Sequence, residues 1–138
     1  METKFNFNSQ ICTTREQSEL LLSLGLKKET ADMFHAAIHI GTKIVGYQVS
    51  PIYNEYNFEI FPDDIPAWSL NRLIEMMPLD VVLEGGFDNI FMLTKDQSGY
   101  SVEYDGFSYY YKKNIYDTLI EGIEHLIKEG YFNKEYLV

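Results

Sequence analysis

The chain has 138 residues, the usual size of one domain with its own hydrophobic core. Its hydrophobic fraction of 46% and aromatic fraction of 15% provide ample apolar surface for folding, which argues against wholesale disorder. Eleven Lys and Arg stand against 21 Asp and Glu, and a net charge of −10 offers no basic face for nucleic acid or an anionic membrane. We therefore expect a single domain spanning residues 1–138 whose partner is neither nucleic acid nor a membrane.

The cysteine content indicates a reducing compartment. Cys12 is the only cysteine, so no intramolecular disulfide can form, and the sequence shows neither a signal peptide nor an apolar run long enough to cross a bilayer. We expect a cytoplasmic location. Arg15 is the only cation near Cys12 in the sequence, and the sequence shows no histidine partner for the thiol. We therefore interpret Cys12 as an inert thiol rather than a nucleophile.

The first 36 residues predict a helical hairpin. Residues 14–17, Thr-Arg-Glu-Gln, form a capping box that begins one helix, and Gly25 followed by Leu26 is typical of a Schellman ending. A second short helix is predicted over residues 28–36, with Ala31 and Phe34 turned towards the first helix.

The middle of the chain predicts strands and one helix. Period-2 alternation over residues 45–49 and 56–60 indicates two strands, and the Pro-rich residues 62–66 mark an internal joint. A helix is predicted over residues 67–77, preset by Pro66 and ended by Pro78. Two short buried strands are expected over residues 81–83 and 90–94.

The C-terminal part contains the most specific pattern. Asp105-Gly106 lies between two alternating runs, which is typical of a two-residue type I′ hairpin; that register pairs Tyr104 with Phe107 and Val102 with Tyr109. Asn114 and Gly130 predict the N-cap and C′ residue of a last helix that packs across the sheet. The aromatic residues 131–138 are expected to dock on the body.

These elements predict an α+β fold. We expect an antiparallel sheet of about five strands, with a β-meander in the C-terminal half. The N-terminal helical hairpin, the middle helix and the C-terminal helix are expected to pack on it.

The common catalytic signatures are absent, and we expect no cofactor. His35 and His39 have the spacing of two ligands on one helical face, with Asp32 as a third candidate, but the pattern is weak and ordinary histidines are favoured over a metal site. In the predicted hairpin register Tyr110 points away from the core beside Glu103, and exposed tyrosine is common at interfaces. Glu103 and Tyr110 are therefore the candidate partner-binding residues.

Three stretches of the chain carry a family resemblance. Residues 13–18 with 24–26 and 30–33, residues 65–70, and residues 121–137 resemble small uncharacterised proteins encoded by phages and mobile elements of gut bacteria. The matching segments are caps, turns and core positions, so the resemblance implies no activity.

Three functions remain as hypotheses. We favour a non-enzymatic protein-interaction domain of phage or mobile-element type, with an unidentified protein partner. The first alternative is an acidic mimic of nucleic acid that inhibits a host enzyme, since the net charge is −10. The second is a small metal-dependent enzyme using Asp32, His35 and His39. The sequence leaves the oligomeric state open.

Overall fold

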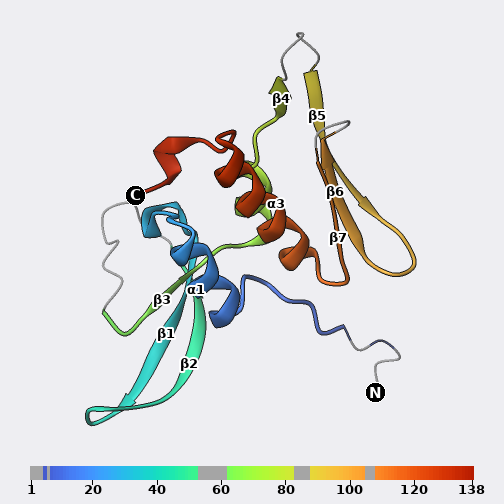
Figure 1. Cartoon of the computed structure of the whole chain (residues 1–138). Coiled ribbons are helices and arrows are strands. Elements are labelled where there is room, and N and C mark those ends of the chain that lie inside the picture. The colour runs from blue at the N-terminus through green and yellow to red at the C-terminus, as the bar shows by residue number, and fades with distance from the viewer. Residues whose placement is uncertain (1–4, 6, 53–61, 83–87, 105–107) are drawn as a thin grey trace.

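The computed structural model describes residues 5, 7–52, 62–82, 88–104 and 108–138. In this part of the chain, three α-helices accompany two antiparallel sheets, ordered β2-β1-β3 and β4-β5-β6-β7 (Figure 1). The predicted α+β class and the C-terminal meander are confirmed. The prediction of one sheet with about five strands is wrong, because the described strands divide between a three-stranded and a four-stranded sheet.

The elements follow one another in chain order, with two short 3₁₀ helices named η1 and η2. The helices are α1 (Arg15–Ser23), η1 (Lys28–Thr30), α2 (Leu70–Met76), α3 (Ile115–Glu129) and η2 (Lys134–Tyr136). The strands are β1 (Met33–Ile40), β2 (Lys43–Pro51), β3 (Ile65–Ala67), β4 (Asp80–Val82), β5 (Asp88–Lys95), β6 (Tyr100–Tyr104) and β7 (Ser108–Lys112).

Helix α1 begins and ends as its sequence predicts. The Thr14 hydroxyl accepts the Gln17 N–H at 3.1 Å, and the Gln17 side chain accepts the Thr14 N–H at 2.9 Å, which completes the capping box. At the other end Gly25 has φ 101°, and the Leu26 N–H donates to the Leu21 carbonyl at 3.2 Å. This is the Schellman geometry, in which glycine tolerates the left-handed conformation without steric cost.

The predicted helical hairpin is wrong, because only the short turn η1 follows α1 and the chain then extends into β1. Strand β1 pairs with β2 from Met33 to Ile40 across a two-residue turn in which Gly41 has φ 65°. Glycine at the first position of such a turn is a hairpin signal that the sequence reading missed. Tertiary pairing with β2 therefore prevailed over the helical spacing of residues 28–36.

The other middle elements match their predictions in part. Residues 45–49 lie in β2, 81–82 in β4 and 90–94 in β5, whereas the predicted strand 56–60 and residue 83 lie outside the described residues. The helix predicted over residues 67–77 is shorter, because residues 65–67 form β3 and Ser69 caps α2. The expectation that β4 and β5 are wholly buried is wrong: Val81 is buried, but Val82 and Ile90 are exposed.

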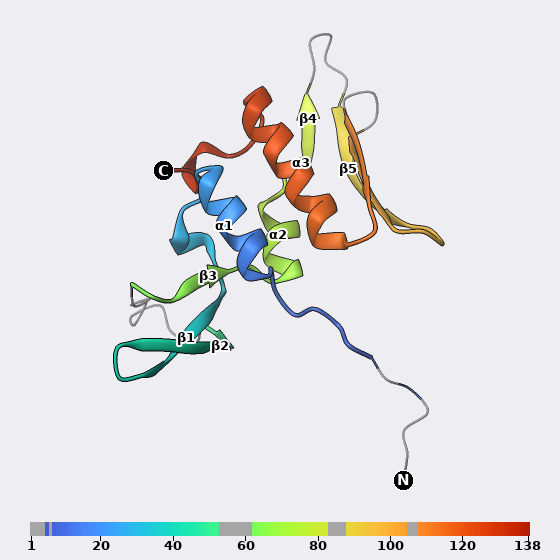
Figure 2. The same cartoon turned by 60° about the horizontal axis from the view of Figure 1, so that its bottom comes forward.

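Helix α3 lies between the four-stranded sheet on one side and helices α1 and α2 on the other (Figures 1 and 2). Asn114 caps its first turn and Gly130, with φ 82°, ends it, as predicted. The chain after α3 docks on the body: Phe132 is buried, and the Val138 N–H donates to the Gly25 carbonyl at 2.8 Å. The largest fully buried side chains of the core come from both halves of the chain: Trp68, Tyr104, Leu21, Leu26, Leu73, Leu119, Ile123 and Leu126.

No helix in the described part of the chain combines the length and apolar character needed to cross a membrane.

Candidate functional site

The pairing of β6 with β7 decides which tyrosine faces the solvent. Tyr104 lies opposite Ser108 and Val102 lies opposite Tyr110, one residue away from the predicted register. Three residues rather than two therefore separate the paired strand ends, although the turn at Asp105-Gly106 itself lies outside the described residues. Because side chains alternate between the faces of a sheet, this shift exchanges the faces of Tyr109 and Tyr110.

Tyr110 points inwards, so the reason for proposing it as an exposed binding residue is wrong. Its ring packs edge-on against His125 of α3, with 5.4 Å between ring centroids and 87° between planes. The ring also lies close to Gly122 of the same helix, where a Cβ would be 3.7 Å from it, an ordinary packing distance. Tyr109 is instead 61% exposed. Glu103 keeps its predicted outward face, directly opposite Tyr109.

One face of the four-stranded sheet is covered by α3, and the opposite one carries exposed apolar side chains. We call this second surface the outer face; its members are Val82, Ile90, Met92, Glu103 and Tyr109. Met92 and Tyr109 are the neighbours of Glu103 on the two adjacent strands. Ile90 is 61% and Met92 48% exposed, and no described helix lies on this side of the sheet (Figure 1).

The outer face has the chemistry of a protein-binding surface. Apolar and aromatic side chains that gather on a sheet face gain free energy when a partner removes them from water. Glu103 in their midst favours a partner that brings Lys or Arg to the same place. Tyr111, two residues beyond Tyr109 on β7, donates its hydroxyl hydrogen to Asp96 at 2.8 Å. The pKa of Asp96 is lowered mainly by the hydrogen bond from the Ser98 backbone N–H and next by the bond from Tyr111. The carboxylate that holds the turn between β5 and β6 therefore stays charged.

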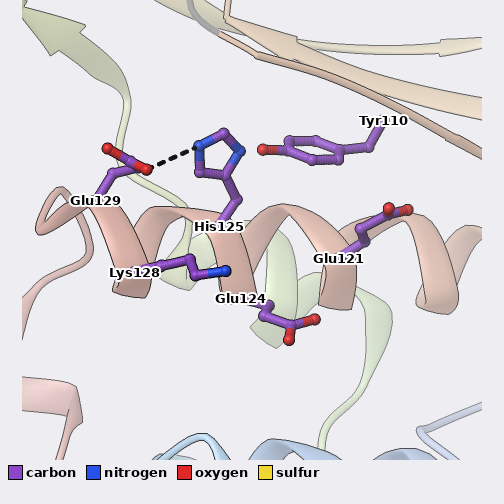
Figure 3. Close-up of a pocket in the computed structure, with 6 residues that line it drawn as sticks. All are labelled: Tyr110, Glu121, Glu124, His125, Lys128 and Glu129. Carbon is purple, nitrogen blue, oxygen red and sulfur yellow. Dashed lines mark ion pairs between the residues drawn. The ribbon is translucent and has the colours of Figure 1, made fainter.

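A second surface feature is a hollow of about 300 Å³ beside α3 (Figure 3). Its lining residues are Tyr110, Glu121, Glu124, His125, Lys128 and Glu129. The Tyr110 hydroxyl points towards the imidazole of His125, which also lies 3.6 Å from the Glu129 carboxylate (Figure 3). The hollow is shallow and bordered by carboxylates of the same helix, so it offers no enclosed space in which substrate could be kept from water.

The three residues weighed as weak metal-ligand candidates bind different partners. Asp32 accepts hydrogen bonds from the Ser69 N–H at 2.8 Å and the Ser69 hydroxyl at 2.5 Å. His35 and His39 lie on β1, not on a helix; His35 Nε2 bonds the Thr13 carbonyl at 2.8 Å, and His39 Nε2 lies 3.0 Å from Asp63. No three His, Cys, Asp or Glu side chains of the described residues are gathered closely enough to hold a metal ion.

Cys12 is buried at the lead-in to α1. Burial raises the pKa of the Cys12 thiol above its usual value, and the nearby charge of Asp32 raises it further. The reactive thiolate is thereby disfavoured at neutral pH, as expected for an inert cysteine.

Carboxylates line part of α3, the feature that a mimic of nucleic acid would need. Asp117, Glu121 and Glu124 share a helical face, but Lys112 lies 3.7 Å from Glu121 and Gln17 donates to Asp117 at 2.7 Å. Partners from the same chain therefore already bind two of these carboxylates, and the row is not a bare stripe of negative charge.

Comparison with family models, with curated proteins and with solved structures gave no match to this chain. The case for a function therefore depends on the geometry of the outer face.

Proposed function

We propose that the chain is a non-enzymatic protein-interaction domain that binds its partner through the outer face. The single observation that supports this proposal is the contrast between the two faces of one sheet. Val102 and Tyr104 of the inner face are buried in the core, whereas Ile90, Met92 and Tyr109 of the outer face are 48–61% exposed. Exposed apolar side chains gathered on one sheet face are typical of interaction surfaces.

The partner should combine apolar side chains with positive charge. Glu103 lies between Met92 and Tyr109, so an approaching Lys or Arg would form an ion pair within an apolar surround. The net charge of −10 would speed the approach of a partner segment that carries positive charge.

The proposal is tested by comparing which proteins of a host lysate bind the immobilised wild-type chain and two variants. Ile90→Ser/Met92→Ser alters the outer face, and Ile40→Ser/Val45→Ser removes two exposed apolar side chains from the tip of the β1–β2 hairpin as a matched control. We expect specific proteins to bind the wild type and the control but not the outer-face variant. Circular dichroism checks that both variants are folded. An unchanged set of bound proteins, or a wild type that binds neither a lysate protein nor a second copy of the chain, would contradict the proposal.

An origin in a phage or mobile element and a cytoplasmic location stay predictions. They fit an interaction domain that acts on a host protein, but the proposed surface does not depend on them. No observation in the described residues favours an acidic mimic or a metal-dependent enzyme over a protein-interaction domain.

A further inference from the structure

The N-terminal segment projects from the body as an extended arm (Figures 1 and 2). We use this name for the described residues 5 and 7–11. Phe5 is 73%, Phe7 85% and Ile11 61% exposed. The rings of Phe5 and Phe7 stack with centroids 6.1 Å apart and planes 14° apart, so both lie on the same side of the arm. Two large apolar side chains are thus exposed to solvent on a segment that is already extended like a strand.

The root of the arm is held on the body by hydrogen bonds of Gln10. Gln10 donates through Nε2 to the Cys12 carbonyl at 2.8 Å and accepts from the Asn114 amide at 3.0 Å. The Tyr116 hydroxyl donates to the Gln10 carbonyl at 3.2 Å. These bonds place the arm beside the start of α3 and leave Phe5 and Phe7 pointing into solvent.

The four-stranded sheet has an open edge next to the outer face. Strand β5 runs to Lys95, but β4 pairs only with its first three residues, and the Phe91 N–H donates to the Leu79 carbonyl at 3.1 Å. From Met92 onwards β6 is the only described neighbour of β5. The alternation of strand hydrogen bonds turns the N–H groups of Leu93 and Lys95 towards the same open edge as that of Phe91. An added strand would find backbone groups ready to pair.

We propose that the arm of one copy pairs with this open edge of β5 in a second copy, and that the two copies exchange arms reciprocally. The inference rests on the proposed function, because it names a second copy of the chain as the partner of the outer face. Phe5 and Phe7, on one side of the arm, cover Ile90 and Met92, while the arm backbone extends the sheet in line with β4.

The charge of the arm and the area that it would bury both favour the arm of a second copy as the segment that pairs with β5. Residues 5–14 contain no charged residue and Lys4 precedes them, so the arm meets Glu103 without repulsion although the whole chain is acidic. Two phenylalanines bury roughly 300–500 Å² per arm. Reciprocal exchange, with the surface that each arm covers, buries roughly 1,200–2,000 Å², the size of specific stable interfaces. A twofold axis closes the assembly at two copies.

The test measures the mass of the full chain in solution by sedimentation over a range of concentrations. Phe5→Ser/Phe7→Ser disables the arm, Ile90→Ser/Met92→Ser disables the receiving face, and Ile40→Ser/Val45→Ser is the matched control. We expect the wild type and the control to dimerise, and each of the other variants to raise the dissociation constant by more than roughly tenfold. Because all six side chains are exposed, circular dichroism should show the same fold throughout.

Mixing the arm variant with the face variant provides the sharpest measurement. The face variant still has a wild-type arm and the arm variant still has a wild-type face, so one intact arm–face contact is restored in a mixed dimer. We expect heterodimers in the mixture at concentrations at which neither variant self-associates. Direct packing of two outer faces would not restore association in this way.

Three results would overturn the inference. They are a wild type that stays monomeric throughout, an arm variant that dimerises as well as the wild type, and a mixture in which no heterodimer forms. In the second case, loss of the dimer in the face variant alone would retain the outer face as an interface while removing the arm from it. In the first, the lysate binding experiment still decides the proposed function separately.

Discussion

The two sheets of this protein are held in place by different interactions. The four-stranded sheet packs its inner face on α3, where Val102, Tyr104, Leu119 and Ile123 are almost completely buried in one core. The three-stranded sheet is attached mainly at one end, where His35 bonds the Thr13 carbonyl. Its hairpin then projects away from the core (Figure 2).

This difference shows where the stability of the fold is concentrated. Burial of apolar side chains supplies most of the free energy of folding, so the region around α3 should tolerate few changes. The β1–β2 hairpin carries Ile38, Ile40, Ile44 and Val45 at its far end, each more than a third exposed, and these should be replaceable at little cost. The attachment of the β1–β2 hairpin to the region around α3 depends on hydrogen bonds that a single substitution can remove.

The largest expected effect compares the same substitution in the two regions. Ile123 is fully buried on α3 and Ile40 is 71% exposed at the hairpin tip. Ile123→Ala should lower the free energy of unfolding by about 2–5 kcal/mol through lost burial and a cavity, whereas Ile40→Ala should change it by less than about 0.5 kcal/mol. Urea denaturation followed by circular dichroism measures both. Equal losses would mean that the hairpin tip is packed.

An intermediate effect is expected where the three-stranded sheet joins the body. Asp32→Ala removes the acceptor of the Ser69 N–H and hydroxyl and should cost about 1.5–3 kcal/mol in the free energy of unfolding. Asp63→Ala is the matched control, because Asp63 is more than half exposed and its pair with His39 should contribute no more than about 1 kcal/mol. If the two variants had the same urea midpoint, the junction would not depend on Asp32.

The smallest effect tests the strand register itself. The Tyr104 hydroxyl donates to the Pro78 carbonyl at 2.6 Å, and burial raises the Tyr104 pKa, so Tyr104→Phe should cost about 1 kcal/mol. The Tyr110 hydroxyl is buried without a hydrogen-bond partner in the described part of the chain, so Tyr110→Phe should be neutral or slightly stabilising. Calorimetric unfolding temperatures distinguish the two. A larger loss for Tyr110→Phe would contradict the inward placement of that hydroxyl.

Local signals in the sequence predicted the helix ends well. The capping box at Thr14, the glycine ending at Gly25 and the caps of α3 at Asn114 and Gly130 all depend on residues close together in the chain. Strand β1 could not be predicted in the same way, because its conformation depends on pairing with β2 and β3 rather than on its own helical spacing. The two sheets were missed for the same reason: strand order is a property of distant pairings.

The candidate site shows the same difference between local sequence signals and tertiary contacts at the level of single residues. Alternation along β6 placed Glu103 outwards from sequence alone, since Val102 and Tyr104 flank it and both need burial. Along β7, Tyr109, Tyr110 and Tyr111 are identical, so composition could not show which ring faces inwards. Packing against α3 decided it: the Tyr110 ring packs edge-on against His125, and Tyr109 is left on the outer face. The sequence by itself determined helix ends and the face of Glu103, whereas register and exposed surface followed from tertiary contacts, because only these distinguish chemically equal neighbours.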